Sequence, residues 1–446
     1  MKFFLVDISD NVKFTLTKDD IRVQRYRWVT LILFCFLTIV NLMQVLQFTI
    51  IANLIAKYFD ISSSIVHMTG TIFFIIFILL FLPINYLIQK YSLRVTIIVS
   101  STLTFAGILV KLFCCDASKF YVLLIGQGIC ACGQVYVLSI PSKLASVWFG
   151  SNELSTACSI AVMSIQAGGA IGGILPPFLI YHDTVDAIGH SLYRMLILNA
   201  IMAGIVFILI LLFFRAKPDY PPSKSQRQLL SEDQPSGISI VGSELYKNKD
   251  FLCLLFTFGL SYGIYNGLGV VFNTIYIEYF PNGETDLGIT TGLSIICGGV
   301  IGSTFFGFLL DKTHQFKKLS ITVLVMSCLC FILEAYTVLM SNRVGTFFTI
   351  PIFEFFIAST YTIGIEFVTE VSYPVPESTS CGALNAIIYL FAIGSTFTME
   401  FLIGAAGYLT TLIVILCAFV LCIISLMFVS SNFRRTKANL MNEIDL

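Results

Sequence analysis

A succession of long apolar runs constrains the fold of this chain more than any other feature of its sequence. Each run holds about 20 residues or more, the length that a helix needs to cross the hydrocarbon core of a bilayer. The twelve runs are residues 28–56, 66–88, 95–115, 120–146, 154–180, 193–214, 250–281, 287–310, 318–341, 345–371, 379–402 and 408–430. Only Gly404 to Gly407 separate the last two, which makes this the weakest boundary. We therefore expect an all-α polytopic membrane protein with twelve transmembrane helices.

The composition supports this class and argues against several others. Hydrophobic residues make up 57% of the chain and charged residues 12%, about half the charged fraction of a typical soluble protein. The net charge is zero and no block of Lys and Arg occurs, so we expect no nucleic-acid partner. The 13 Cys lie mostly inside apolar runs without metal-site spacing, so we expect no metal and no cofactor. No Ser/His/Asp set or phosphate loop is recognisable, which makes an enzyme a distant third hypothesis.

The distribution of Lys and Arg predicts the orientation, because these residues are retained on the cytoplasmic side of short loops. With both termini in the cytosol, 21 of the 26 Lys and Arg lie on the inner side. The five on the outer side are Lys57, Lys111, Lys119, Arg194 and Arg343. The first 27 residues lack the apolar core of a cleaved signal peptide. We expect a multi-pass protein with cytosolic termini and favour the plasma membrane.

A polar stretch at 215–249 divides the runs into two sets of six. It predicts a cytosolic linker between an N-terminal bundle (28–214) and a C-terminal bundle (250–430), with a cytosolic segment at 1–27 and a cytosolic tail at 431–446. Two six-helix bundles joined in this way resemble the major facilitator superfamily fold. In that fold a site at the membrane midplane is exposed alternately to either side.

A short repeat suggests where the bundles form a gate. Asn85 to Lys90 follow the second run, and Gly307 to Lys312 follow the eighth. The second copy resembles the loop signature of the superfamily. Asp311 and Lys312 are therefore candidate gate residues, although charge satisfaction at a helix end is an alternative. Glu366 and Glu370, one turn apart in the tenth run, are expected beside them.

Glu354 lies three turns deeper in the tenth run and is a candidate cation partner or proton site. The alternative is a protonated carboxyl that hydrogen-bonds a neighbouring helix. The four His, at positions 67, 182, 190 and 314, lie at the ends of runs or in loops. We expect no proton relay through them.

The stretch Pro141 to Phe178 joins two runs through a polar hinge and carries Gly169 and Gly173 on one helix face, where small residues let helices approach in lipid. Its motifs PSKLASVWFG, NELSTACSIAV and LPP resemble the feline leukaemia virus subgroup C receptor family. Further matches are Tyr26-Arg27-Trp28, Leu310-Asp311-Lys312 and Glu366-Phe367. The resemblance implies a carrier for choline and ethanolamine, with an older assignment as a heme exporter and viral receptor roles in some members.

The resemblance also implies a site in which an aromatic cage holds a quaternary ammonium group. Of the four cage positions, only the Gln of the fourth run is retained, as Gln134. The cage Trp corresponds to Val45, the cage Tyr to Asn266, and the Gln of the eleventh run to Tyr389. The Asp-Trp of the family at the start of the second run is replaced by His67-Met68.

The residues themselves indicate a polar interior. Gln127 and Gln134 share one face of the fourth run, and Asn385 and Tyr389 lie one turn apart in the eleventh. The other candidates are Gln44, Gln47 and Phe48 in the first run and Tyr262, Tyr265, Asn266 and Asn273 in the seventh. Because unpaired amides are costly in hydrocarbon, these side chains should face the interior, where they either line a cavity or hydrogen-bond helix to helix.

Two functions of different class remain. The first is an alternating-access carrier of a small polar solute: choline, ethanolamine or a related organic amine, or alternatively heme or another metabolite. The second is a non-transporting membrane receptor or sensor that keeps the fold. The retained Gln134 and the gate turn favour the carrier. We expect a monomer whose partners are a small cationic amine and the lipid bilayer.

Overall fold

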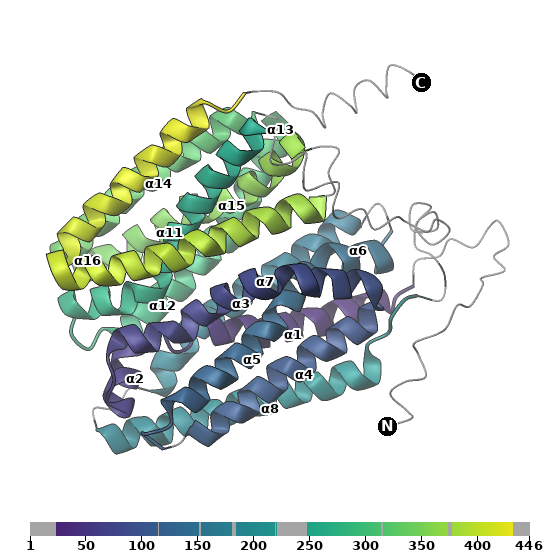
Figure 1. The fold of residues 1–446 in the computed structure, drawn as a ribbon, viewed down its shortest axis with the longest axis horizontal. Coiled ribbons are helices and arrows are strands. Elements are labelled where there is room, and N and C mark those ends of the chain that lie inside the picture. The colour runs from purple at the N-terminus through teal and green to yellow at the C-terminus, as the bar shows by residue number, and fades with distance from the viewer. Residues whose placement is uncertain are drawn as a thin grey trace.

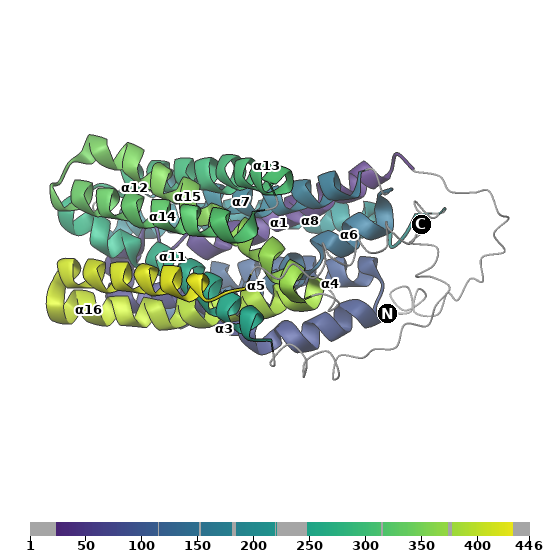
Figure 2. The ribbon, with the colours of Figure 1, turned by 90° about the horizontal axis from the view of Figure 1, so that it is seen from above.

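The computed structural model describes residues 24–114, 116–150, 153–180, 184–218, 220, 248–313, 315–372 and 377–430. These residues form a bundle of long helices that lie side by side (Figures 1 and 2). Most of the predicted N-terminal segment, nearly all of the predicted linker and the predicted tail lie outside the described residues. The domain boundaries drawn from the sequence therefore remain predictions.

The helices follow the apolar runs. The first half of the chain forms α1 (Arg27–Leu46), α2 (Ala52–Phe59), α3 (Ser63–Lys90), α4 (Leu93–Lys111), the 3-10 turn η2 (Leu112–Cys114), α5 (Phe120–Ser139), α6 (Pro141–Trp148), α7 (Leu154–Leu179) and α8 (Val185–Phe213). The second half forms α11 (Lys249–Tyr279), α12 (Glu284–Ile295), the π-helical segment η3 (Ile296–Gly302), α13 (Ser303–Thr313), α14 (Phe316–Leu339), α15 (Arg343–Ser372) and α16 (Glu377–Met427).

The weakest predicted boundary is a sharp break within α16. Eleven helical stretches of the described chain are long and apolar enough to span a membrane, and the last one, which lies within α16, runs for 48 residues. At Gly407 the backbone leaves the helical region, with φ 78° and ψ 174°. The chain turns back there, so α16 holds the eleventh and twelfth spans (Figure 1). The prediction of twelve transmembrane segments is confirmed.

Two other predicted runs are not single helices. Within run 28–56, helix α1 ends at Leu46, and α2 begins at Ala52 after a turn. Run 120–146 ends at Ser139, and Pro141 opens α6 at the first helical position. Proline suits that position because its missing N–H needs no partner there. Both runs stay apolar across the break, and hydropathy alone therefore predicted one helix where two occur.

The two ends of the bundle differ in what they carry. One end holds α2, and we call it the α2 end. At the opposite end, Ser430 N donates to Asp250 Oδ1 (2.9 Å) and Lys317 Nζ donates to Met427 O (2.8 Å). We call this the linker end, because the chain leaves α8 and enters α11 there.

Buried apolar side chains gather mainly within each half of the chain. One large cluster draws its fully buried members from the first half, among them Phe34 and Trp148. Two others draw theirs from the second half, around Phe331 and Phe258. On the outward faces large apolar side chains are exposed, as lipid-facing positions require. Examples are Leu79, Phe113, Phe308 and Phe401.

Glycines of α7 form one seam between the halves. A Cβ on Gly173 would lie 3.1 Å from Thr291 Cγ2 of α12. A Cβ on Gly172 would lie 2.5 Å from Met43 O of α1, so the next position faces the other way. The predicted small-residue face of α7 is confirmed, and the helix packs closely on both sides.

The second seam joins α3 to α16. Phe74 of α3 forms a buried cluster with Val270 of α11 and Ala392 of α16. Further along, a Cβ on Gly382 would lie 2.0 Å from Phe81 Cζ, so a larger residue there would require the ring to move. The halves therefore meet along α3 and α16 and along α7 and α12.

Candidate functional site

Three tyrosines of the second half lie together midway along their helices. The rings of Tyr262 and Tyr361 stack with centroids 4.9 Å apart, and the rings of Tyr262 and Tyr265 lie 5.1 Å apart. Tyr361 OH donates to Asn385 Oδ1 (3.0 Å). All of these side chains are half-buried. We call Tyr262, Tyr265 and Tyr361 the tyrosine cluster.

Glu354 adds a carboxyl group to this cluster. Tyr265 OH donates to Glu354 Oε1 at 2.5 Å, and Glu354 is only 6% exposed. The segment η3 makes room for it, since a Cβ on Gly298 would lie 2.5 Å from Glu354 Cγ. Such π-helical interruptions are frequent at functional sites. The contact is the hydrogen bond to a neighbouring helix that the alternative for Glu354 anticipated, and it also puts the carboxyl next to aromatic rings.

Tyr389 connects the cluster to the first half. It belongs to α16, yet its ring stacks on Phe74 of α3 (centroids 5.1 Å apart) and meets Phe77 edge-on (4.7 Å). Tyr389 and Tyr361 also pack against the same buried cluster of the second half. Tyr389 therefore lies at the seam between the halves, and a movement of one half against the other would change its contacts with α3.

The remaining cage positions are spread over both halves. Asn266 Nδ2 donates to Tyr262 O (2.8 Å) within its own helix. Val45 is half-buried against the first-half core. Gln134 is 3% exposed, and its Oε1 has no hydrogen-bond partner. A buried acceptor without a partner is costly, which makes Gln134 a natural contact for a ligand that donates a hydrogen bond.

Gln44, Gln127 and Phe48, expected near the interior site, instead surround a residue that the sequence did not single out. Lys111 is fully buried, and its Nζ donates to Gln44 Oε1 (2.7 Å) and Gln127 Oε1 (2.8 Å). The ammonium group also lies 5.5 Å from the centre of the Phe48 ring. The charge count had placed Lys111 on the outer side, and a Lys near the end of an apolar run gives no signal that separates an exposed position from a buried one.

Polar contacts close the α2 end across the two halves. His67 Nδ1 of α3 lies 2.6 Å from Glu400 Oε1 of α16, and its Nε2 lies 3.2 Å from Thr274 Oγ1 of α11. Asn53 Nδ2 donates to Glu284 Oε1 (2.5 Å). The sequence had assigned His67 no role beyond the end of a run, because no partner adjoins it in sequence.

A further contact at the same end joins α11 to the turn before α2. Asn273 Nδ2 donates to Ile50 O (2.6 Å), and Asn273 Oδ1 accepts from Asn53 N (3.2 Å). Asn273 therefore hydrogen-bonds from helix to helix, the second of the two roles expected for these amides.

The predicted gate residues lie at the linker end. Asp311 and Lys312 are in the last turn of α13, with the Lys312 side chain exposed and that of Asp311 outside the described side chains. Glu366 is exposed and Glu370 is buried, although they lie one turn apart on α15. Their role as a gate remains a prediction.

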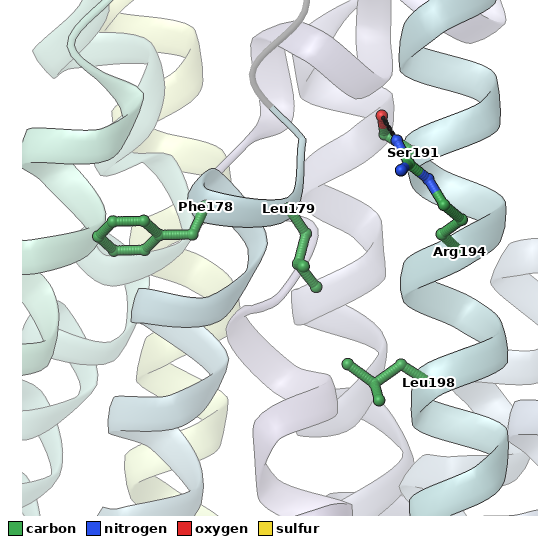
Figure 3. Close-up of a pocket in the computed structure, with 5 residues that line it drawn as sticks. All are labelled: Phe178, Leu179, Ser191, Arg194 and Leu198. Carbon is green, nitrogen blue, oxygen red and sulfur yellow. Dashed lines mark hydrogen bonds between the residues drawn. The ribbon is translucent and has the colours of Figure 1, made fainter.

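A pocket of about 390 Å³ lies elsewhere, at the α2 end between α7 and α8 (Figure 3). Phe178 and Leu179 line it from α7, and Ser191, Arg194 and Leu198 line it from α8. Arg194 Nη2 donates to Ser191 Oγ (3.1 Å). None of the predicted site residues lines this pocket.

Comparisons with known proteins identify the family. The model of the Major Facilitator Superfamily matches residues 32–374. The Danio rerio choline/ethanolamine transporter flvcr2a is 34% identical over 423 residues, which cover 94% of this chain and 89% of the relative. The chain belongs to the FLVCR branch of the Major Facilitator Superfamily. The Homo sapiens choline/ethanolamine transporter FLVCR2 is 32% identical over 94% of this chain and 80% of its own length.

Solved structures support the fold. A bacterial homologue of the human lysosomal transporter Spinster superposes with a TM-score of 0.65 over 92% of this chain and 95% of that one, at 14% identity. The predicted family and the predicted superfamily fold are thereby confirmed, and this FLVCR-branch protein is a multi-pass integral membrane protein. The roles of its individual site residues remain predictions.

Proposed function

We propose that this FLVCR-branch protein is an alternating-access transporter of a small organic amine: choline, ethanolamine or a close relative. The observation that carries the proposal is the tyrosine cluster with Glu354, which offers aromatic faces and a carboxyl group midway along the helices of a transporter fold. Aromatic faces and carboxylates both attract organic cations. Relatives that match most of the chain are named as choline/ethanolamine transporters.

The substrate would bind between the halves. Tyr262, Tyr265 and Tyr389 would contact its cationic group, and Gln134 would accept a hydrogen bond from its hydroxyl or ammonium group. In the described structure the α2 end is held closed by His67 and Asn53. Opening that end and closing the other would expose the same site to the opposite side of the membrane.

The orientation belongs to the same proposal. Placing the linker end in the cytosol puts both termini and the 215–249 linker there, in line with the excess of Lys and Arg. The α2 end then faces outward, in the plasma membrane. We further propose that the protein acts as a monomer and is not an enzyme. Heme transport and a receptor without transport are not favoured by any contact at the site.

Uptake of labelled choline and ethanolamine into cells that produce the protein tests the proposal. We expect uptake above that of control cells, and its loss in Tyr389→Ala at equal surface expression, because this variant removes the aromatic face at the seam. Tyr389→Phe keeps that face and is expected to retain uptake. If the wild-type protein reaches the surface and takes up neither amine, the proposal is wrong.

A further inference from the structure

Glu354 is a buried carboxyl within a transmembrane helix and lacks a basic partner in the described part of the chain. Ion pairs there include Arg27 with Glu153, His67 with Glu400, Lys119 with Asp116, and Arg343 with Asp286, none of which involves Glu354. A carboxylate removed from water is costly unless it is paired or hydrogen-bonded. The Tyr265 hydroxyl satisfies one of its oxygens, which leaves the group able to accept from a cation.

A second buried carboxyl lies on the neighbouring helix. Glu334 of α14 is 3% exposed, and its Oε2 has no hydrogen-bond partner. Helix α14 packs against α15, which carries Glu354. Two neighbouring carboxyls in an apolar setting repel each other when both are ionised. A bound cation relieves that repulsion, so the pair favours a positively charged ligand.

The surroundings select an organic cation over a metal ion. Ca²⁺ and Mg²⁺ require about six oxygen ligands, and within the described ranges no three His, Cys, Asp or Glu side chains are grouped to hold a metal. Glu354 instead accepts from Tyr265, whose ring lies beside that of Tyr262, and Tyr262 in turn stacks on Tyr361. Aromatic faces bind ammonium groups by cation–π attraction.

The carboxyl distinguishes between ammonium groups. A primary or secondary ammonium donates N–H hydrogen bonds, and such charge-assisted bonds to a carboxylate are short and strong. A quaternary ammonium presents only methyl groups and relies on aromatic enclosure. Here the positions that correspond to the cage Trp and Tyr are Val45 and Asn266, so enclosure is reduced.

We propose that Glu354, held by Tyr265, binds the ammonium group of the substrate and that the site prefers primary and secondary amines to quaternary ammonium compounds. The inference rests on the proposed transport of organic amines and specifies their class. The matching contact for the hydroxyl group of the substrate is Gln134, whose Oε1 is buried without a partner.

A methylation series tests the preference in the wild-type protein. Ethanolamine, N-methylethanolamine, N,N-dimethylethanolamine and choline are compared as substrates, each labelled, in cells that produce the full chain. We expect transport efficiency to fall along the series, with the largest step at choline, which alone lacks an N–H. An equal or higher efficiency for choline overturns the inference while leaving the proposed function intact.

Glu354→Gln tests the residue. The amide keeps the shape and can still accept from Tyr265, but it carries no charge. Losing a charge-assisted hydrogen bond should reduce the preference for ethanolamine over choline by about tenfold or more. The control is Glu278→Gln on the exposed face of α11, which should leave the preference unchanged.

The outcomes separate the two proposals. If Glu354→Gln is made at normal levels and keeps the wild-type preference, Glu354 is not the anchor. If the variant does not reach the membrane, the preference is measured on the purified wild-type protein instead. Thermal-shift assays then compare the binding of the four amines of the methylation series. Failure of the wild-type protein to transport or bind any member of the series contradicts the proposed function itself.

Discussion

At the scale of the residue, Lys111 depends on a small number of partners. Its ammonium group is fully buried, and its hydrogen-bond acceptors are the side-chain oxygens of Gln44 and Gln127. Gly126 admits its stem, since a Cβ there would lie 2.4 Å from Lys111 Cγ. A buried cation is costly unless it is hydrogen-bonded, so the loss of either acceptor should destabilise the protein.

Gln127→Leu should therefore destabilise the protein. It removes a hydrogen bond to a charged group, which is worth about 1.5–3 kcal/mol in the free energy of unfolding, together with the two bonds that Gln127 Nε2 donates to Gln44 O (2.9 Å) and Thr69 O (3.2 Å). Adding Lys111→Met should recover at least about 1 kcal/mol, because no buried cation then remains to be satisfied. Denaturant unfolding of the two variants in detergent micelles measures both effects. Equal stability of the single and double variants would show that Lys111 does not depend on Gln127.

The sequence predicted a substrate-site role for Gln44 and Phe48, which stays a prediction, but it did not predict the contact that both make with Lys111. Gln44 and Phe48 were expected to line a substrate site because their side chains are polar or aromatic within an apolar run. Their actual partner lies more than 60 positions away, on α4. Residue types and helical spacing identify the polar face of a helix. They do not identify the helix that packs against this face, because that depends on the sequences of both helices. In contrast, Tyr262, Tyr265, Tyr389 and Glu354 were all chosen from sequence and do gather in one region.

At the scale of the element, the break in α16 depends on a single glycine. Gly407 has φ 78° and ψ 174°, a region that residues with a side chain rarely adopt. No atom lies within 4 Å of a Cβ added there, so steric contact does not require glycine and backbone conformation does. The eleventh and twelfth spans therefore owe their hairpin to this conformation.

Gly407→Ala should lower stability by about 1–3 kcal/mol through backbone strain alone. Gly404→Ala is a matched control, because a Cβ there also meets open space and the residue has no positive φ. It should leave stability unchanged or raise it by up to about 1 kcal/mol, since alanine favours the helix. Thermal unfolding of both variants in detergent compares them. Equal effects would argue that the turn tolerates side chains.

The transmembrane helices were the most predictable part of the structure, because the length of each apolar run can be read directly from the sequence. The positions of the spans and the cut near Gly407 follow from hydropathy and glycine content. The turn between α1 and α2 and the start of α6 at Pro141 could not be predicted in this way. The sequence stays apolar at both places, although the helix is interrupted there.

At the scale of the whole molecule, the two halves meet through seams of different chemistry. Along α7 and α12 the contact is between small residues, and along α3 and α16 it is aromatic near Tyr389 and polar at the α2 end. The sequence predicted two sets of six helices because the polar stretch at 215–249 divides the apolar runs. The sequence could not predict which residues hold the two sets together at the α2 end. The two residues of such a contact, His67 and Glu400, are 333 positions apart.

Weakening that contact should favour opening of the α2 end. His67 Nδ1 lies 2.6 Å from Glu400 Oε1, and the pair bridges α3 and α16 only while the end is closed. Glu400→Gln replaces a charged partner with a neutral one. The amide can still accept from His67, but a neutral hydrogen bond is worth about 1 kcal/mol less than one to a charged group, so the ratio of open to closed molecules shifts toward open by about fivefold.

Cysteine accessibility measures this shift. Val270→Cys places a thiol in the buried cluster between Phe74 and Ala392, where a reagent reaches it only when the halves part. A membrane-impermeant maleimide applied from outside, with the labelling of native cysteines subtracted, should modify it faster in Glu400→Gln than in the Val270→Cys protein alone. The exposed variant Glu278→Gln should not change the rate. An unchanged rate in Glu400→Gln would mean that the His67 contact does not limit opening, and that other contacts, such as those of Asn53 and Asn273, hold the α2 end closed.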